Sequence, residues 1–249
     1  MFLTRFFEDI GRYFMLMKLV FRRPDNVRMY WSAFVRDLYS LGVNSLGLVC
    51  IISLFVGAVV TIQTALNLEN PIIPKYYIAI ATRESIILEF SPTMISLILA
   101  GKVGSNIAST LGTMRVSEQI DALEVMGVKS ASYLIMPKIA ATLFFNPILI
   151  TLSMFLGIIG GYFFGTATGM VTPTEFTKGL QMDYRPFYIV YALIKTVVFA
   201  FVITSISAYY GYFVKGGAVE VGANSTKAVV TSSLVLILTN YLLTQLLLG

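Results

Sequence analysis

Long stretches without a charged side chain constrain this sequence more than any other feature. Four of them cover residues 38–68, 139–174, 196–214 and 228–249, with 31, 36, 19 and 22 residues. About 20 apolar residues cross a bilayer as a helix. Only 12% of the chain is charged and 57% is hydrophobic, whereas a soluble domain carries about 25% charged residues. The composition therefore excludes a soluble globular enzyme and indicates an all-α membrane protein.

A fifth span is interrupted by Glu89 and Lys102, with 12 uncharged residues between them. We still predict a helix through the membrane there, because without it the flanking charged segments would fall on sides that contradict the distribution of basic residues. We treat residues 1–249 as a single domain. The five predicted spans are 40–66, 78–111, 139–170, 187–213 and 228–248.

The basic residues predict the orientation. Segments 1–40, 102–138 and 211–230 hold thirteen of the 18 Lys and Arg residues, whereas 67–90 and 171–186 hold four. Basic residues concentrate on the cytoplasmic side of membrane proteins. We therefore expect a cytoplasmic N-terminus and a C-terminus on the other side.

Residues 1–23 are not typical of a signal peptide, because charged residues are scattered among the apolar ones. Their apolar residues recur at spacings of three and four: Phe2, Phe6, Phe7, Ile10, Phe14, Met17 and Phe21. This periodicity predicts an amphipathic helix in the membrane interface, with its basic face on anionic head groups.

The segment RVSEQIDALEVMGVK, which begins at Arg115, predicts a short amphipathic helix over residues 115–127. Val116, Ile120 and Leu123 share one side of it, whereas acidic residues occupy the other. One interpretation is a solvated loop helix. The other is a docking surface for a basic groove of a partner.

Gly157, Gly161, Gly165 and Gly169 stand four residues apart, which predicts a smooth helix face for close packing against another helix. A role in ligand binding is the weaker interpretation of this row.

An ionisable side chain within a membrane is energetically costly, so each one requires a structural or functional explanation. Glu89 lies three residues before Pro92, so it either faces a hydrated cavity or points at bulk water beyond the span. Gln63 either lines the same cavity or bonds another helix. Lys195 needs a partner or water, unless it snorkels outward.

Several chemistries are excluded. The chain has no histidine and one cysteine, Cys50, so a zinc site, a Cys/His nucleophile and a disulfide framework are not expected. Gly101-Lys102 lacks the other residues of a phosphate-binding loop, so energy must come from a partner or a gradient. We predict no catalytic residue and no nucleic-acid binding.

Four segments of the sequence are distinctive: SPTMISLILAGKVGSNIASTLGTMRVSEQIDALEVMGV (91–128), FVGAVVTIQ (55–63), IKTVVFAF (194–201) and GYFVKGGAVEVGANSTKAVVTSS (211–233). In these segments, and most strongly in 91–128, the sequence resembles the MlaE-like permeases of Mla/Mce-type ABC transporters. Family members often have a basic residue before the acid and Gly-Pro after it. Here Leu88 precedes Glu89 and Ser91 precedes Pro92.

The resemblance implies a homodimeric permease of the bacterial inner membrane, with a separate cytoplasmic ATPase that binds ATP and Mg. It also implies exchange of phospholipid with a periplasmic Mce-domain protein, and a role in outer-membrane lipid asymmetry. Contact with the ATPase would fall on Arg115, Glu118, Gln119, Asp121 and Glu124. The lipid cavity would involve Gln63, Glu89 and Pro92. Two other classes stay open: an ion-coupled secondary transporter or channel that uses Lys195 and Glu89, and a membrane scaffold without transport.

Overall fold

The computed structural model describes residues 2–22, 27–68 and 72–248. Over these ranges every regular element is a helix and no strand occurs. Five helical stretches within them are long and apolar enough to cross a membrane. The prediction of an all-α membrane protein with five spans is confirmed.

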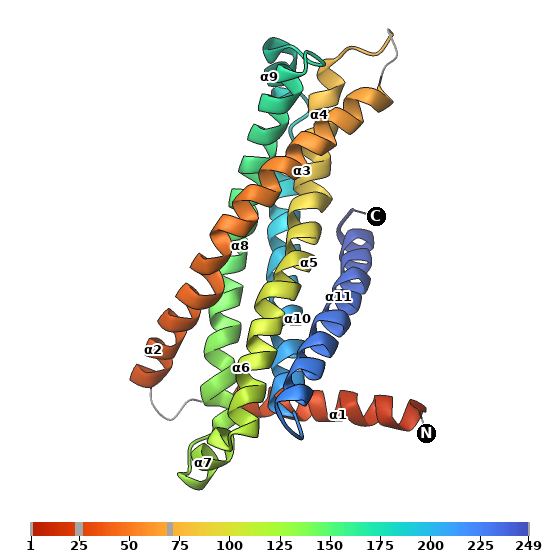
Figure 1. The fold of residues 1–249 in the computed structure, drawn as a ribbon. Helices are drawn as coiled ribbons and strands as arrows, with labels where there is room; N and C mark the ends of the chain where they lie inside the picture. Colours follow the sequence, from red (N-terminus) through yellow and green to blue (C-terminus); the bar gives the residue numbers. More distant parts are fainter. Residues whose placement is uncertain (1, 23–26, 69–71, 249) are drawn as a thin grey trace. The chain divides into compact units, whose positions relative to one another are not determined.

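Figure 1 shows the helices in chain order. They are α1 (Phe2–Val20), α2 (Val27–Asp37), α3 (Leu46–Asn67), α4 (Tyr76–Ser85), α5 (Ile95–Leu99), α6 (Ser105–Val116), α7 (Gln119–Val125), α8 (Ser130–Ala167), α9 (Pro173–Gln181), α10 (Phe187–Tyr212) and α11 (Ala218–Leu248). Three π-helical segments, Leu38–Gly42, Ile86–Met94 and Ala100–Gly104, and one 3₁₀ turn, Val43–Ser45, join neighbouring helices. As a result, helical stretches that could cross the membrane extend over Arg28–Asn67 and Tyr76–Val116.

The ends of these helical stretches differ from the span boundaries that were predicted from the positions of charged residues. The observed stretches are Arg28–Asn67, Tyr76–Val116, Ser130–Ala167, Phe187–Tyr212 and Ala218–Leu248. Arg36, Glu84 and Lys138 all lie inside helices. A helix continues into polar residues beyond the hydrocarbon, so charges mark the limits of the apolar region and not those of the helix.

The chain forms two compact units, each assembled from three segments. The first contains Met1–Asn44, Leu97–Phe145 and Val198–Leu242, and the second contains Ser45–Ser96, Asn146–Val197 and Leu243–Gly249. The boundaries fall within the 3₁₀ turn Val43–Ser45 and within helices α5, α8, α10 and α11.

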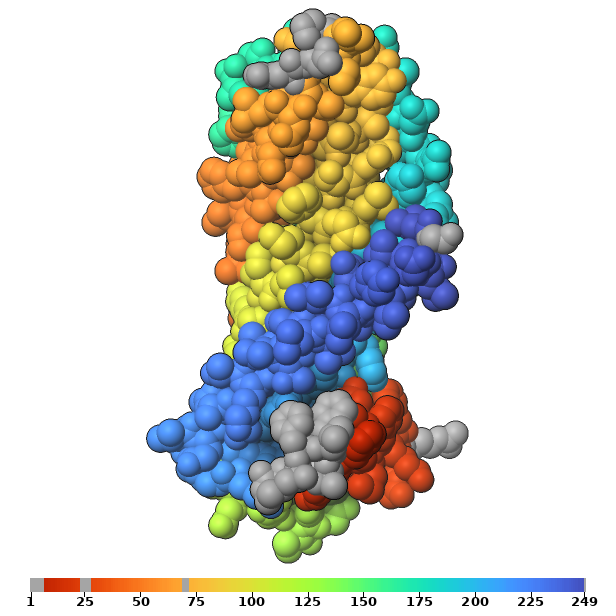
Figure 2. Space-filling view, turned by 90° about the vertical axis from the view of Figure 1, so that its right-hand side faces the viewer, coloured from red at the N-terminus to blue at the C-terminus, as the bar shows by residue number. Residues whose placement is uncertain are grey.

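Helix α11 is the least covered of the five membrane-length stretches within the described residues. Only 11% of its most apolar window is buried, against 50% for α10. Figure 2 shows α11 in blue on the surface turned to the viewer. Its exposed apolar side chains include Val230, Leu234, Ile237, Leu238, Tyr241, Leu242 and Leu246.

In the first unit, two tyrosines fix α1 to the last turns of α10. The Tyr13 hydroxyl donates to Ser205 Oγ at 2.8 Å, and the Tyr209 hydroxyl donates to Asp9 Oδ1 at 3.2 Å. Burial raises the pKa of the Tyr13 hydroxyl, so this group remains a neutral donor. The ribbon shows α1 lying crosswise to α10 (Figure 1). Leu16, Met17 and Val20 are buried on α1.

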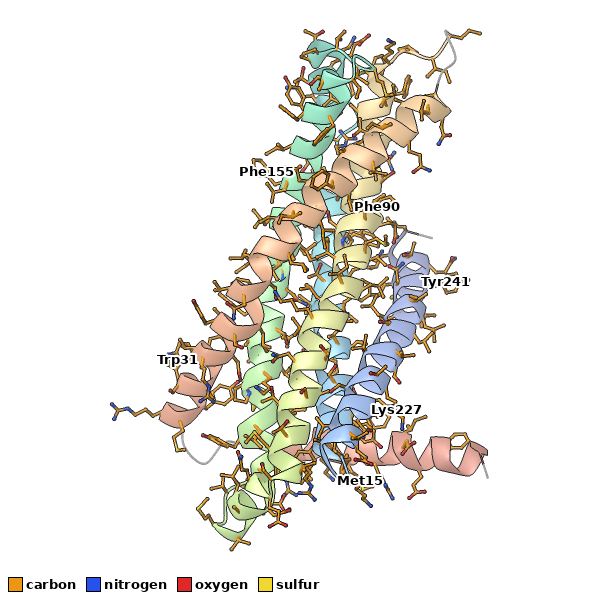
Figure 3. The ribbon with its side chains drawn as sticks, in the orientation of Figure 1. Met15, Trp31, Phe90, Phe155, Lys227 and Tyr241 are labelled. Carbon is orange, nitrogen blue, oxygen red and sulfur yellow. The ribbon has the colours of Figure 1, made fainter. Side chains whose placement is uncertain are left out.

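The remaining surface of α1 is exposed and carries apolar side chains together with charged ones such as Glu8, Arg12 and Lys18. Its exposed side chains include Phe7, Phe14, Met15 and Leu19, of which Met15 is labelled in Figure 3. Such a surface suits the membrane interface. Met17 belongs to the predicted lipid face but is buried against protein instead, because periodicity does not distinguish the two apolar surroundings. The side chains of Phe2 and Phe6, and residues 1 and 23 of the predicted helix, lie outside the described part.

In the second unit, α3 and α8 approach each other at glycines. A Cβ atom on Gly57 would overlap the carbonyl oxygen of Gly157, and one on Gly160 would overlap that of Leu54. Gly161 and Gly165 both face Thr61. The two helices therefore touch backbone to backbone, as small residues permit in membranes.

Gly169 does not take part in this packing. It lies beyond the end of α8, its φ is 72°, and no heavy atom stands within 4 Å of the position of a Cβ. A positive φ favours glycine, so this residue turns the chain where the helix stops. The row of packing glycines on α8 ends at Gly165 and includes Gly160, which the four-residue spacing does not predict.

Both ends of α9, which also belongs to the second unit, are capped. At its start, the Thr172 hydroxyl accepts from the Glu175 N–H, and the Glu175 carboxylate accepts from Thr172. These hydrogen bonds to the charged form lower the pKa of Glu175. At its end, the buried Arg83 donates to the carbonyl oxygens of Leu180 at 2.7 Å and Met182 at 2.8 Å. A guanidinium is favourable at a helix C-terminus.

We predict that Gly57→Ala destabilises the protein, because the added methyl group meets backbone atoms that cannot rotate away. Overpacking costs about 1–3 kcal/mol, which lowers Tm by about 2–12 °C in a chain of this size. The measurement is a melting curve in detergent. The control is Gly47→Ala in the same helix, where a Cβ meets nothing within 4 Å. Equal melting temperatures for the two variants would contradict this packing.

Candidate functional site

A buried lysine organises the middle of the second unit. Lys195 on α10 is 0% exposed, and its Nζ donates to Glu89 Oε1 at 2.9 Å. It also donates to the Tyr191 hydroxyl at 2.8 Å and to Thr244 Oγ1 at 3.4 Å. A buried charge is stable only when it is paired and hydrogen-bonded. We call Lys195, Glu89, Tyr191 and Thr244 the lysine cluster.

The π-helical segment Ile86–Met94 explains why Lys195 has a further acceptor. In an α-helix the N–H of residue 92 would bond the carbonyl of Leu88, but Pro92 has no N–H. Lys195 Nζ donates to that carbonyl oxygen at 3.2 Å. The proline thus makes a backbone acceptor accessible to a cation, and local π-helix often accompanies functional sites.

Glu89 connects the lysine cluster to the surface of its unit. Its side chain is 43% exposed, while that of Lys195 is 0% exposed. Its second oxygen, Oε2, accepts from Thr93 at 3.0 Å. The pair is therefore a fixed cation behind a half-exposed carboxylate. A polar group that reaches Glu89 enters the field of both charges.

Of the three residues predicted to line a lipid cavity, two lie in the π-helical segment Ile86–Met94 and one lies on α3. Glu89 belongs to the lysine cluster, and Pro92 is buried in the π-helical segment. Gln63 is exposed on α3 and is not a partner of Lys195 in the described part of the chain. Sequence reasoning identified the need of Lys195 for a partner. It missed Tyr191 and Thr244, because nothing in the local pattern marks them.

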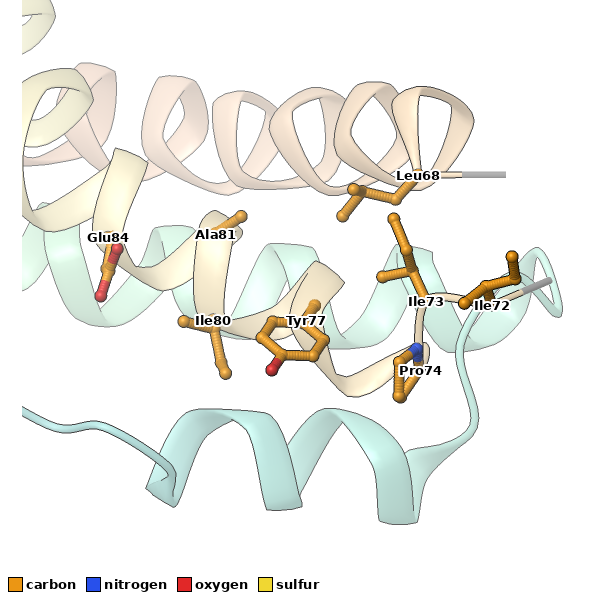
Figure 4. A pocket seen from close by; sticks show the side chains of 8 residues that line it. All are labelled: Leu68, Ile72, Ile73, Pro74, Tyr77, Ile80, Ala81 and Glu84. Atoms are coloured by element: carbon orange, nitrogen blue, oxygen red, sulfur yellow. The ribbon is translucent and has the colours of Figure 1, made fainter. Parts of the chain in front are cut away.

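An apolar pocket of about 530 Å³ lies at the start of α4, also in the second unit. Figure 4 shows its lining: Leu68, Ile72, Ile73, Pro74, Tyr77, Ile80, Ala81 and Glu84. Aliphatic and aromatic side chains dominate, with one carboxylate. Such a surface accepts hydrocarbon better than a polar solute. The sequence pattern did not predict this pocket.

The loop that was predicted to couple to an ATPase contains α7, in the first unit. Glu118 precedes α7 with a φ of 58°, and this left-handed residue makes the sharp turn from α6. Arg115 and Asp121 are joined by an ion pair of 2.6 Å across the turn. Gln119 Nε2 donates to Ser117 Oγ at 3.0 Å. These contacts hold the loop in one conformation.

Gly127 ends α7 with a φ of 78°. Its N–H donates to Glu124 O at 3.0 Å, and the N–H of Val128 donates to Leu123 O at 3.0 Å. This pair of bonds is the Schellman arrangement, in which a glycine closes a helix. Ile120, the apolar anchor of α7, is 0% exposed.

Glu124 fixes α7 to two longer helices. Its Oε1 accepts from the Ser130 hydroxyl at 2.7 Å and from the Tyr212 hydroxyl at 3.0 Å. The Ser130 and Tyr212 hydroxyl oxygens lie 2.7 Å apart, so either hydroxyl can donate to the other in place of Glu124. Ser130 begins α8 and Tyr212 ends α10. The Glu124 carboxylate thus joins α7 to two longer helices, whereas Arg115 and Asp121 pair with each other and Gln119 bonds Ser117.

The outward surface of the loop is partly apolar. Val125 is 89% exposed and Met126 is 69% exposed. Glu118, Gln119 and Asp121 are exposed beside them. Sequence reasoning missed Val125 and Met126, because it assigned the docking surface by charge. We call Glu118, Gln119, Asp121, Val125 and Met126 the α7 surface.

Known proteins resemble the chain over nearly its whole length. A probable ABC transporter permease protein of Rickettsia bellii is 32% identical over 242 residues, which cover 97% of this chain and 93% of that protein. The intermembrane phospholipid transport system permease protein MlaE of Haemophilus influenzae is 29% identical over 246 residues, 98% of this chain and 94% of that protein. The chloroplastic protein TRIGALACTOSYLDIACYLGLYCEROL 1 of Arabidopsis thaliana is 32% identical over 223 residues, 88% of this chain and 62% of that protein.

A family model described as permease MlaE matches residues 34–246. That range contains the described part of all five membrane-length stretches except for a few terminal residues, and it includes the lysine cluster and the α7 surface. The predicted resemblance is confirmed. This multi-pass membrane chain belongs to the MlaE permease family.

Proposed function

We propose that the chain is the membrane subunit of an ATP-driven phospholipid transporter in the bacterial inner membrane, with its N-terminus in the cytoplasm and its C-terminus in the periplasm. It performs no covalent chemistry. A separate ATPase binds ATP and Mg and docks on the α7 surface. The observation that carries the proposal is the tether of α7: Glu124 bonds Ser130 and Tyr212, so a force on the loop reaches two membrane-length helices.

Two features of the second unit support a lipid as the substrate. The pocket beside Tyr77 offers an apolar surface of the kind that an acyl chain needs. The lysine cluster offers opposite charges within a membrane-length helix, where a polar head group requires compensation. We infer that lipid passes to a periplasmic Mce-domain protein. The Haemophilus relative is named as a permease of an intermembrane phospholipid transport system.

We further propose that two copies of the chain form the permease. The exposed apolar face of α11 supports this, because it extends over most of the helix. ATP-driven change requires that the ATPase binds the two states of the dimer with different affinity. The tether through Glu124 connects α7 directly to α8 and α10, so a movement of these helices between the two states would also move the α7 surface.

An ion-coupled secondary transporter is the second candidate, and the Lys195–Glu89 pair favours it. Such a transporter moves its substrate when an ion gradient is imposed and no ATPase is present. The proposed function requires the opposite result. Reconstituted vesicles with the ATPase omitted, and with a proton or sodium gradient imposed, separate the two.

The first prediction concerns the α7 surface. Val125→Glu should weaken ATPase binding at least about 10-fold, because a charge placed in an apolar contact loses its hydration without gaining a partner. The measurement is the Kd for the purified ATPase in detergent. The matched control is Val219→Glu, which alters another valine that is 82% exposed. Unchanged affinity of the Val125 variant would refute docking at this surface.

The second prediction concerns the tether. Tyr212→Phe removes the hydroxyl that contacts both Glu124 and Ser130, and each hydrogen bond lost costs about 1 kcal/mol, or about fivefold. The ATPase should still bind and hydrolyse ATP, but the lipid moved per ATP should fall several-fold. Tyr210→Phe, which removes a bond to Thr231 of 3.1 Å, is the control. Normal coupling in the Tyr212 variant would show that the tether is only structural.

The third prediction separates stability from transport at the lysine cluster. Lys195→Met should lower Tm, because it leaves the Glu89 carboxylate without its cation. The double variant Lys195→Met, Glu89→Gln removes both charges and should recover much of that Tm. Lipid transport should remain low in both variants. Transport at the original rate by the double variant would exclude the pair from the lipid path.

A further inference from the structure

A polar cavity lies in the first unit, which contains no residue of the lysine cluster. Its volume is about 230 Å³, and its lining includes Arg36, Asp37, Asn106, Thr110, Tyr133 and Lys138. These residues come from the end of α2, from α6 and from the beginning of α8. The proposed transport function does not use this cavity.

A buried ion pair forms one wall. Lys138 Nζ donates to Asp37 Oδ1 at 2.8 Å, and the two side chains are 11% and 9% exposed. An ammonium group has three N–H donors, and Asp37 accepts one of them. The pair fixes the position of the cation, and its remaining donors are available to a ligand in the cavity.

Arg36 gives the cavity a net positive charge. It is exposed in the last turn of α2 and forms no ion pair with any residue that the structure describes. The Asp37–Lys138 pair is neutral, so Arg36 leaves one positive charge. Asn106, Thr110 and Tyr133 add amide and hydroxyl groups. This set suits a phosphate group, which accepts hydrogen bonds from guanidinium and ammonium donors.

The surroundings of the cavity favour a lipid over a soluble anion. Trp31 stacks on Phe34 at 5.2 Å between ring centroids, and Phe34 meets Phe144 edge to face at 6.4 Å. Trp31 and Tyr39 are both 63% exposed, and Figure 3 labels Trp31 on α2. Tryptophan and tyrosine concentrate at the head-group level of membranes. Exposed apolar side chains next to a cationic cavity provide a place for acyl chains.

We propose that this cavity binds the phosphate-bearing head group of an anionic phospholipid from the adjacent leaflet. The bound lipid is a resident one, held by Arg36 and Lys138 while its acyl chains lie along the aromatic side chains of α2. Basic pockets between membrane helices bind anionic head groups in this manner. The proposal requires a membrane protein but does not require that the protein transports lipid.

The test is native mass spectrometry of the whole chain in detergent, titrated with dioleoylphosphatidylglycerol or dioleoylphosphatidylcholine. We expect dioleoylphosphatidylglycerol to bind at least about 10-fold more tightly than dioleoylphosphatidylcholine, and we expect Arg36→Gln to remove that preference. Arg36→Lys should keep part of it, because the charge remains. Thr110→Leu should also reduce binding, since it fills the cavity without changing charge.

The controls decide between this site and general charge effects. Lys215→Gln removes an exposed cation of the same unit outside the cavity, and it should leave the preference unchanged. An equal loss in Lys215→Gln, or no preference in the original chain, would overturn the proposal. Inorganic phosphate that competes with the lipid at equal concentration would reassign the cavity to a soluble anion.

Discussion

The lack of water in a bilayer places the strongest constraint on this structure, since each backbone N–H and C=O there needs a partner within the protein. Helices meet this need everywhere except where their ladder is broken. Pro92 interrupts the ladder of backbone hydrogen bonds because it has no N–H. The backbone around it forms a π-helical segment, and the ammonium group of Lys195 donates to the Leu88 carbonyl oxygen. The cost of burying that ammonium is offset by Glu89 and two hydroxyl groups. A backbone defect and a buried charge therefore stabilise each other.

In the first unit, a single carboxylate, that of Glu124, attaches α7 to its neighbouring helices. Glu124 accepts from two hydroxyl groups, whose oxygens also lie 2.7 Å from each other. The two hydroxyl hydrogens can therefore satisfy two of these three contacts at a time, and the compact polar group holds α7 against both helices. Attachment on one side and exposed Val125 and Met126 on the other are what the proposed coupling role requires of α7.

The sequence predicted what depends on local patterns. Gaps between charges indicated four spans, the distribution of basic residues indicated the fifth, and four-residue spacing indicated that Gly157 and Gly161 face another helix. It did not predict the partner of Lys195, because Glu89 lies 106 positions away and only the fold brings the two together. It placed Glu124 with the other acids of the loop, because a helical wheel does not show which side meets α10. Met17 was placed toward lipid for a similar reason, since its periodicity is the same against lipid and against protein.

Helix α11 shows how exposure in a membrane should be interpreted. A helix that faces lipid alone should be the most apolar of its set, because lipid offers no hydrogen bonds. Within the described residues, α11 has the lowest mean hydropathy of the five membrane-length stretches and also the least buried surface. Gln245 is exposed on it, close to the exposed Tyr241 and Leu242. An uncovered surface with amide and hydroxyl groups is better satisfied by a second protein surface or by a hydrated cavity than by acyl chains. This reasoning supports a dimer in which α11 contributes to the interface or to the cavity that it encloses.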